Sequence, residues 1–498
     1  MRVTSLYIDN YKMLKEFSIN FHKDVSILIG INGSGKSTIL ESIAQIFSDA
    51  FLKKQSKFGF KLEYELRLEE TLEQTATTSE FKTEYIKVEI SASEKDEPLM
   101  FKVFSADKII ERENEIEKHF GNFEKILPSN IVIYYSGLAE IMKKICLPHD
   151  EMLSVNFRKG NTNIHRPFFY FEPTLFEIIL LTLLSYEFGD IPEFLNQRAK
   201  IKGVESIKIS LKKPGWGKGK MENWWGAKGE VKVFLDFLDS IGSPLLIDEN
   251  SLTNGSKGNV VIEGWQNEVL NITIWGQEKL FEIREHFTEE KTFFKILNTL
   301  TIDGFAPEIK FSFIQEDGGK KTFNVLSEGE QQAIIIRGLI ELVNNENTLF
   351  LFDEPDTYLH PSWQRNFIEN INQLATINEI NTSQFLITTH SPQLLSNADP
   401  ASCDVQIMED GEIVKVTPKY YGRDISTILY EMMGVERRNK KVAKSLSILF
   451  NLIEDEELEK SKAEYTKLVE ILGEDDPAMI RAKTQLDYLQ EDTNEAGN

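Results

Sequence analysis

The sequence predicts an α/β fold built around a parallel, doubly wound sheet, with an inserted α-rich subdomain and a helical C-terminal tail. A short apolar run leads through a glycine-rich loop into a helical pattern, and two further apolar runs alternate with helical patterns later in the chain. Such strand–helix alternation is typical of parallel sheets. The strands are expected at 25–29, 348–352 and 384–388, and the helices at 39–47, 329–342 and 364–374.

The N-terminal part, residues 1–137, is expected to contribute most of the remaining strands. Residues 3–8 alternate between apolar and polar side chains, as a half-buried strand does, and residues 131–135 are also strand-like. The charged stretch 107–127 is predicted to be a helix. Further strands are expected at 58–68 and 83–90.

Residues 138–306 differ in composition from the residues before them, and their pattern predicts an inserted, mostly helical subdomain. Helical patterns alternate there with loops rich in Gly, Asn and Lys, and are expected at 175–187, 231–241 and 277–300. The subdomain contains a basic segment, 197–232, with ten Lys or Arg residues against three acids, a local charge of +7. The rest of the chain then carries a formal charge of −30.

The C-terminal third is expected to complete the sheet and then leave it. Residues 307–435 should hold the second part of the sheet domain, which ends in a hairpin over 405–416 with a turn at Asp410-Gly411. Residues 436–498 predict an acidic helical tail with helices at 456–472 and 477–489. Two interpretations of this tail stand: a docking site for a partner, or a cap on the protein's own core.

Composition excludes several classes of protein. The chain has 498 residues, of which 41% are hydrophobic, so wholesale disorder is excluded. The net charge of −23 excludes a general nucleic-acid coat, because phosphates would be repelled. Two cysteines cannot build a disulfide framework or a Cys-based zinc site. No signal-peptide core or membrane-spanning stretch is present, so a cytoplasmic protein without a membrane partner is expected.

The glycine-rich loop from Gly30 to Ser37 matches the P-loop pattern Gly-x-x-x-x-Gly-Lys-Ser, in the required context of a strand before and a helix after. Backbone N–H groups of such a loop surround phosphates, the lysine reaches the β- and γ-phosphate oxygens, and the hydroxyl ligates Mg²⁺. ATP and Mg²⁺ are therefore the expected cofactors. The expected nucleotide-binding residues are Asn32, Gly33, Ser34, Gly35, Lys36, Ser37 and Thr38.

Two acids, Asp353 and Glu354, end the apolar run 348–352. An aspartate at the carboxyl end of a buried strand is suited to hold a metal ion, so Asp353 and Ser37 form the predicted Mg²⁺ site. Glu354 is the predicted general base for an attacking water.

Two further motifs complete a family pattern. Residues 326–331 read Leu-Ser-Glu-Gly-Glu-Gln and resemble the signature motif of the ABC-type ATPase superfamily, although the spacing of Ser327 and Glu330 also fits an ordinary capping box. Residues 387–392, Ile-Thr-Thr-His-Ser-Pro, resemble the switch motif of that superfamily. Together with the P-loop and the acid pair, these motifs occur in the order that the superfamily has.

The resemblance implies an ABC-type P-loop ATPase head that hydrolyses ATP between two protomers. It implies that Ser327, Gly329 and Glu330 contact the nucleotide of the second protomer. His390 would act in catalysis beside Glu354, by sensing the γ-phosphate and orienting water. Asp356 matches the D-loop, which crosses the dimer interface in the superfamily.

Within the RecF/SMC-like group, the pattern is closer to compact RecF-like or defence-system heads than to chromosome-organising ATPases with long arms, and it also differs from transporter heads. Lys36 and Ser327 lie 291 residues apart, and no heptad repeat predicts a long coiled-coil arm. The element Asn10-Tyr11-Lys12 resembles an early element of these heads that contacts nucleotide, with a surface turn as the other interpretation of Lys12. No glutamine occurs at the expected Q-loop position near 134–137.

Within that group, residues 420–425 and the acidic tail resemble the PtuA-type ATPases of Septu anti-phage systems and the ATPases of retrons. This resemblance implies a head-to-tail homo-oligomer that regulates a separate HNH-type nuclease subunit. Nuclease activity is not expected in this chain, because no two of its seven histidines are close in sequence. The alternative is a RecF-like DNA-repair ATPase that binds DNA directly.

The basic segment interleaves lysines with tryptophans, and lysines neutralise phosphates while tryptophans stack on bases. One interpretation is a nucleic-acid contact, direct or within a complex; the other is a solvated loop whose tryptophans pack back onto the subdomain. The candidate contact residues are Lys212, Lys213, Trp216, Lys218 and Lys220.

Overall fold

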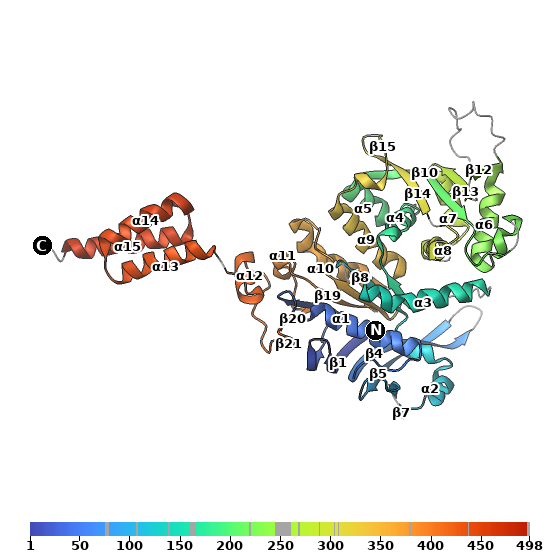
Figure 1. The fold of residues 1–498 in the computed structure, drawn as a ribbon, viewed down its shortest axis with the longest axis horizontal. Coiled ribbons are helices and arrows are strands. Elements are labelled where there is room, and N and C mark those ends of the chain that lie inside the picture. Colours follow the sequence, from blue (N-terminus) through green and yellow to red (C-terminus); the bar gives the residue numbers. More distant parts are fainter. Residues whose placement is uncertain are drawn as a thin grey trace. The chain divides into compact units, whose positions relative to one another are not determined.

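The computed structural model contains two units, Met1–Gly422 and Arg423–Asn498 (Figure 1). Each is described by itself below. The structure describes the whole chain except residues 75–78, 106–107, 138–139, 160–165, 219–220, 245–259, 267–268, 288, 303, 307, 378–379, 382, 437 and 496–498.

The larger unit is organised around a seven-stranded sheet of order β21-β20-β3-β19-β16-β8-β9, parallel except at its β20–β21 edge. Every residue of β3 (Val25–Gly30) and β16 (Thr348–Asp353) is buried, which explains their continuous apolar sequences. The predicted parallel sheet is confirmed. The N-terminal strand β3 lies in it between the C-terminal strands β20 and β19. Its other strands are β8 (Asn130–Tyr135), β9 (Phe168–Tyr170), β19 (Gln384–Thr388), β20 (Cys403–Glu409) and β21 (Glu412–Ile413).

Helix α1 (Lys36–Phe51) packs against this sheet and also against a six-stranded antiparallel sheet of order β2-β1-β4-β5-β6-β7. Phe47 of α1 is fully buried and meets Tyr64 of the second sheet edge-on, with ring centroids 5.2 Å apart. Both sheets and the helix thus share one hydrophobic cluster, which fixes the position of the loop before α1. The strands of the second sheet are β1 (Arg2–Tyr11), β2 (Leu14–Asn20), β4 (Phe60–Gln74), β5 (Ser79–Ala92), β6 (Met100–Ser105) and β7 (Lys108–Ile110).

The prediction of one charged helix over 107–127 is wrong. Residues Lys108–Ile110 form β7. The short helix α2 (Glu113–Phe120) and the 3₁₀ turn η1 (Phe123–Ile126) follow it. Gly121, with φ 79°, ends α2 in the left-handed region. The Asn122 side chain then caps η1 by accepting a hydrogen bond from the Glu124 N–H.

The expected mostly helical subdomain over 138–306 also contains a sheet, of order β11-β12-β13-β10-β14-β15. Strand β10 (Ile201–Lys212) pairs antiparallel with β13 (Val269–Trp275) and β14 (Glu308–Gln315), so the sheet crosses the expected boundary at 306/307. Two register shifts in β10 interrupt its alternation of apolar and basic residues, which hid the strand in the sequence. The remaining strands are β11 (Gly242–Pro244), β12 (Val260–Gln266) and β15 (Lys320–Lys321).

Helices pack on the seven-stranded sheet and on the sheet of the inserted segment. Helix α4 contacts α9, α8 and β14, and so joins the inserted segment to the helix that precedes β16 (Figure 1). No helix among the described residues is long and apolar enough to cross a membrane. The helices and short elements are α3 (Ile141–Arg158), η2 (Pro173–Leu175), α4 (Phe176–Leu183), α5 (Asp190–Ala199), η3 (Met221–Gly226), α6 (Gly229–Ile241), α7 (Gln277–Glu285), α8 (Glu290–Ile302), η4 (Phe323–Val325), α9 (Glu328–Val343), α10 (Pro361–Ala375), β17 (Thr376–Ile377), β18 (Ile380–Asn381) and α11 (Pro392–Ser396).

The smaller unit is helical, as expected for the tail, and begins at Arg423 rather than at residue 436. It has its own hydrophobic cluster, which includes Leu449, Leu468 and Met479. Asp476 accepts two hydrogen bonds, 2.8 and 2.9 Å long, from the Arg438 guanidinium. Its helices are α12 (Ile425–Met433), α13 (Lys440–Glu454), α14 (Leu458–Leu472) and α15 (Pro477–Glu495).

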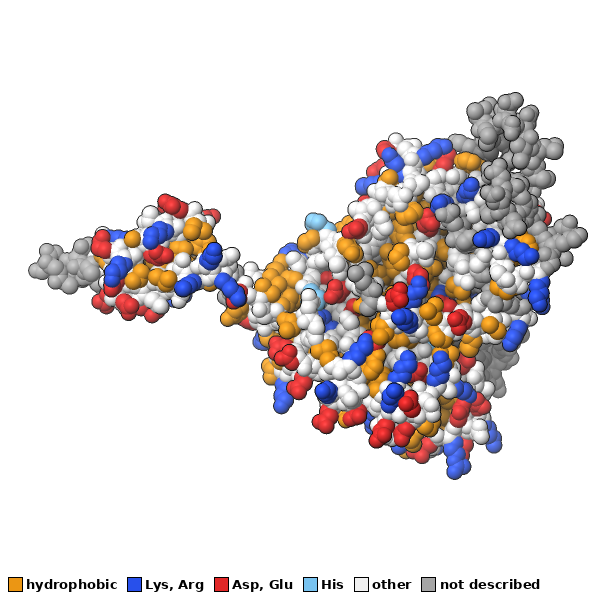
Figure 2. Space-filling model, viewed as in Figure 1, with side chains coloured by type: hydrophobic (Ala, Val, Ile, Leu, Met, Phe, Trp, Pro, Cys, Tyr) orange, Lys and Arg blue, Asp and Glu red, His pale blue; other side chains and the backbone are white. Residues whose placement is uncertain are grey.

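Charged side chains of both signs are interspersed on each unit on the face shown in Figure 2. No continuous basic surface covers that face of either unit.

We expect Leu449→Ala to destabilise the α13–α15 cluster by about 2–5 kcal/mol, because Leu449 is fully buried there and its loss leaves a cavity. Hydrogen exchange of the backbone in α14 and α15 should accelerate, while exchange in α1 stays the same. The neighbouring Ile448, which is 43% exposed, offers the matched control Ile448→Ala. Equal effects of the two substitutions, or equal acceleration in α1, would contradict a separate core.

Candidate nucleotide site

The loop between β3 and α1 has the backbone of a phosphate-binding loop. Gly33 and Gly35 have φ values of 81° and 109°, in the left-handed region that favours glycine. A Cβ at Gly30 would lie 2.1 Å from the Met408 carbonyl oxygen, so only glycine fits where β20 passes behind the loop. The Lys36 ammonium donates to the Gly30 and Ile31 carbonyl oxygens, at 2.9 and 3.1 Å. Burial lowers the pKa of Lys36, and Glu354 and Asp353 oppose this effect.

Three segments meet at the carboxyl of Asp353. The Ser37 hydroxyl donates to Asp353 Oδ1 at 2.8 Å, and the Thr388 hydroxyl donates to the same oxygen at 2.6 Å. Burial raises the pKa of Asp353, and the two hydrogen bonds oppose the rise. The Ser37 hydroxyl and the Asp353 carboxylate are hard oxygen ligands placed together beside the P-loop, which fits Mg²⁺ held jointly by protein and phosphate oxygens.

The proposed base and the switch histidine are neighbours. His390 Nε2 lies 3.3 Å from Glu354 Oε1, and both side chains are about one third exposed, at 35% and 36%. The hydrogen bond with His390 lowers the pKa of Glu354, while burial opposes it, so the carboxyl is ionised at neutral pH. Glu354 has φ 50°, and its N–H donates to the Thr388 carbonyl oxygen at 3.1 Å, which holds the strained backbone in place.

Asp356, the expected D-loop residue, is turned into its own protomer. Its side chain is 3% exposed, and Oδ2 accepts a hydrogen bond of 2.8 Å from the Thr389 hydroxyl. Burial raises the pKa of this carboxyl to about 6. The segment that carries Asp356 is therefore joined to Thr389, the residue that directly follows β19.

The signature residues form the start of α9. Ser327 and Glu330 form a complete capping box, with the Ser327 N–H donating to Glu330 Oε2 at 2.8 Å. A Cβ at Gly329 would lie 2.9 Å from the Tyr358 carbonyl oxygen, so this close approach to the D-loop segment requires glycine. Among the described residues, Ser327 and Glu330 form no hydrogen bond or ion pair with the P-loop of the same chain.

The sequence interpretation missed a buried bridge between motifs. Gln332 of α9, 2% exposed, donates through Nε2 to the Tyr134 hydroxyl at 3.1 Å and accepts from the Tyr358 N–H at 2.9 Å. Tyr134 lies at the end of β8, at the position where the family pattern has the Q-loop glutamine. Because Gln332 and Tyr134 are 198 positions apart, no local pattern could have revealed their contact.

Lys12 lies at the tip of the β1–β2 hairpin with φ 55°. Its ammonium forms an ion pair with Glu41 of α1, which also accepts a hydrogen bond from the Tyr11 hydroxyl. The next residue, Met13, has its sulfur 3.1 Å from the position of a Cβ at Gly35. The hairpin tip thus lies against the P-loop, with Lys12 beside it.

The basic segment does not present its tryptophans as a stacking surface. Trp224 and Trp225 are 7% and 4% exposed, and Trp216 packs edge-on against Phe305 with centroids 5.3 Å apart. The packed-back interpretation therefore describes the tryptophans. Lys212, Lys213 and Lys218 are exposed, and Lys220 lies outside the described residues.

Two protein-family models match the chain. One, described as an AAA ATPase domain, matches residues 1–163, and the other, described as an AAA domain, putative AbiEii toxin, Type IV TA system, matches residues 232–396. The first match contains the P-loop, and the second contains the signature, the acid pair and His390. The chain therefore carries an ATPase domain that is split in its sequence.

Several curated proteins are distant relatives. Retron Ec83 probable ATPase of Escherichia coli is 30% identical over 36% of this chain and 33% of its own length. Retron Vc95 probable ATPase of Vibrio cholerae serotype O1 biovar El Tor is 22% identical over 80% of this chain and 71% of its own length. Septu protein PtuA of Bacillus thuringiensis is 27% identical over 41% of this chain and 55% of its own length. The chain thus spans one third to about 70% of these relatives.

Among solved structures, the SMC head domain from Thermotoga maritima is 14% identical, with a TM-score of 0.31, over 84% of this chain and all of that one. The fold assignment stands on the sheet order and register described above.

We expect Asp356→Asn to stabilise the larger unit, and more so as pH rises. From about pH 4 to about pH 6 the unfolded chain ionises this carboxyl while the folded protein keeps its proton, so the free energy of unfolding of the wild type falls with pH. Asparagine does not titrate and still accepts from Thr389. The difference between variant and wild type should grow by about 3 kcal/mol across that window and then level off.

Urea unfolding followed by tryptophan fluorescence measures this difference, since all six tryptophans lie in the larger unit. Asp9→Asn, at an exposed position of β1, is the matched control and should show no such trend. A difference for Asp356→Asn that is independent of pH would contradict the assignment.

Proposed function

We propose that this chain, a split AAA-type ATPase distantly related to retron ATPases and to Septu PtuA, hydrolyses ATP with Mg²⁺ and regulates a separate HNH-type nuclease in anti-phage defence. The observation that carries the ATPase part is the junction at Asp353. There the P-loop serine, the strand-end aspartate and the switch strand meet within hydrogen-bond distance, next to Glu354 and His390.

Each residue of the junction has a role that follows from its position. The P-loop backbone, residues 32–38, and Lys36 would bind the phosphates, with Lys12 beside them. Ser37 and Asp353 would hold Mg²⁺, which supplies charge neutralisation at the phosphate oxygens. Glu354, ionised and partly exposed, would accept a proton from water, and His390 would hold that water in place.

The signature residues support a site shared between copies. Ser327, Gly329 and Glu330 lie at the N-terminus of α9, where backbone N–H groups favour anions. They make no polar contact with the P-loop of their own chain among the described residues. We therefore propose a head-to-tail homodimer unit in which they contact the nucleotide of the second copy. The segment after Glu354 would lie at the interface through exposed residues such as Tyr358, and not through the buried side chain of Asp356.

The smaller unit is the proposed docking site for the nuclease subunit. Its own core is complete, yet Ile471 of α14 and Tyr488 of α15 are 67% and 66% exposed. Two of the relatives' names, retron ATPase and Septu protein, support a defence role, and the proposed setting is the cytoplasm.

A RecF-like ATPase that contacts DNA itself is the second candidate function. The exposed Lys212, Lys213 and Lys218 favour it, because lysines that neutralise phosphates need to be accessible. ATP-dependent DNA binding by the isolated chain would support this candidate over a partner nuclease.

We expect Glu354→Gln to lower ATP turnover by about 10²–10⁴-fold while leaving ATP binding intact, because the amide cannot accept a proton but keeps the side chain's size. Phosphate release and equilibrium nucleotide binding measure the two effects separately. Glu115→Gln, at an exposed position of α2, is the matched control and should change neither. Turnover at the wild-type rate would remove Glu354 as the base.

We expect the wild-type chain to co-purify with an HNH protein encoded next to it, and Ile471→Glu with Tyr488→Ala to lose that complex. Both positions are exposed, so the variant should keep its fold and its ATPase rate. Lys483→Ala, exposed on α15, serves as the control. Retention of the complex by the double variant would exclude this surface, and absence of any complex with the wild type would sink the partner proposal but not the ATPase.

A further inference from the structure

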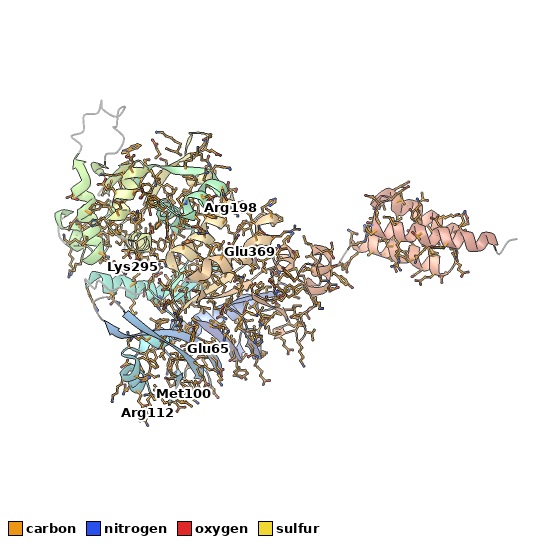
Figure 3. The ribbon with its side chains drawn as sticks, turned by 180° about the vertical axis from the view of Figure 1, so that it is seen from behind. Glu65, Met100, Arg112, Arg198, Lys295 and Glu369 are labelled. Atoms are coloured by element: carbon orange, nitrogen blue, oxygen red, sulfur yellow. The ribbon has the colours of Figure 1, made fainter. Side chains whose placement is uncertain are left out.

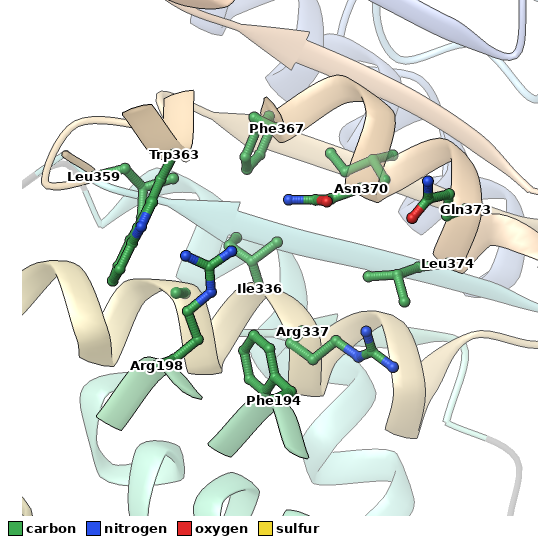
Figure 4. A pocket seen from close by; sticks show the side chains of 12 residues that line it. Phe194, Arg198, Ile336, Arg337, Leu359, Trp363, Phe367, Asn370, Gln373 and Leu374 are labelled. Atoms are coloured by element: carbon green, nitrogen blue, oxygen red, sulfur yellow. The ribbon is translucent and has the colours of Figure 1, made fainter. Parts of the chain in front are cut away.

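A cavity lies between α5, α9 and α10, separate from the nucleotide junction (Figure 4). Its volume is about 130 Å³, and it is partly open to solvent. Helix α5 contributes Phe194 and Arg198, α9 contributes Ile336 and Arg337, and Trp363 lies at the start of α10. The cavity thus joins the inserted segment to the signature helix and to the helix that follows the D-loop.

The lining sets the size and polarity of a ligand. Ile336, Phe367 and Ile371 form a buried apolar floor, with exposed fractions of 6%, 5% and 1%. An engineered apolar cavity of about 150 Å³ in another protein accommodates benzene. The volume here therefore fits one ring or a branched apolar group of similar size, and not a whole nucleotide.

Arg198 supplies the cavity with a cation that has no counter-ion among the described residues. Its guanidinium lies over the Trp363 ring, with the central carbon 4.5 Å from the ring centroid, and it forms no ion pair or side-chain hydrogen bond with any of them. Burial lowers the pKa of Arg198. The chain has 79 Asp and Glu residues against 56 Lys and Arg residues. A shortage of carboxylates in the chain therefore does not explain why Arg198 has no ion pair among the described residues.

A guanidinium carries its N–H donors in a planar fork that matches a carboxylate. Arg198 contacts the Trp363 ring through the guanidinium, and none of its donors forms a hydrogen bond with another side chain of the described residues. Figures 3 and 4 show Arg198 on α5, and Figure 4 shows its guanidinium beside Trp363 at the cavity. The contact with Trp363 therefore keeps the Arg198 side chain at the cavity before any anion arrives.

The second arginine of the cavity differs in its partners. Arg337 already pairs with Asp190 and Glu341, each at 2.6 Å. Its buried Nε has no hydrogen-bond partner. Arg337 thus has a neutralised charge and one unused donor, and Arg198 is the cation left for a ligand.

We propose that this cavity is a binding site for a small organic acid, in which one apolar ring or branched group occupies the floor and a carboxylate accepts hydrogen bonds from Arg198. The aromatic walls, Phe194 and Trp363, enclose the apolar part. The carboxylate supplies the counter-ion that the described part of the chain does not.

The site adjoins the signature motif. The Trp363 ring lies 4.0 Å from the position that a Cβ at Gly329 would take. A ligand held by Arg198 against Trp363 would fix α5 and α10 next to the start of α9. Binding itself is independent of the proposed ATPase function, and the test below does not involve ATP.

The test uses phenylacetate as the probe and the full chain as the protein, with ligand-observed NMR titration as the measurement. We expect saturable binding with a Kd of about 1 mM or tighter, as for a ligand of this size. Arg198→Gln should weaken phenylacetate by about 10–100-fold, the usual loss for a charged hydrogen bond. Ala333→Leu, which fills the cavity, should abolish binding.

Controls separate the site from general attraction of anions. Arg365→Gln removes the same charge from an exposed position of α10 outside the lining and should leave the Kd unchanged. Benzyl alcohol, which lacks the carboxylate, should bind weakly and equally to wild type and Arg198→Gln. No saturation by about 20 mM phenylacetate, equal effects of Arg198→Gln and Arg365→Gln, or acetate binding as tightly as phenylacetate would each overturn the proposal.

Discussion

The buried carboxyl of Asp353 is the constraint on which the larger unit depends. It lies at the end of an entirely apolar strand, where an unpaired carboxylate would be costly. Its two hydrogen bonds come from Ser37 and Thr388, which are 316 and 35 positions away. The carboxyl is therefore satisfied only when β3, from the N-terminal part, has taken its place beside β19. This requirement explains how a domain interrupted by a long insertion still closes into one sheet.

Much of this arrangement could be predicted from the sequence, because its signals are local. A buried parallel strand is a continuous apolar run, and the P-loop, acid pair and switch histidine each sit at the end of such a run. The bridge from Tyr134 through Gln332 to Tyr358 could not be predicted. None of its residues belongs to a sequence pattern that indicates the contact. The bridge forms only because segments far apart in the sequence pack together.

The inserted segment shows the opposite situation, in which local signals mislead. Strand β10 carries lysines on its exposed face and bulges that break the period of two, so its sequence indicates a basic loop. The tryptophans that follow suggested base stacking, but Phe305, about 80 positions later, takes up Trp216 and Trp225 in the core. These tryptophans pack in the core of the subdomain, and the described lysines Lys212, Lys213 and Lys218 remain exposed.

The amide of Gln332 has a consequence for the polarity of the molecule. A backbone N–H can only donate, so the Tyr358 N–H fixes the carbonyl end of the amide toward the D-loop and its NH₂ end toward β8. The Tyr134 hydroxyl must then accept, and its own proton points away from Gln332. Both hydrogen bonds therefore run in one direction, from the Tyr358 N–H through the Gln332 amide to the Tyr134 hydroxyl. If the amide were turned over, its NH₂ group would face the Tyr358 N–H, and two donors would meet. The single amide of Gln332 therefore connects α9 to the end of β8 and to the backbone at Tyr358.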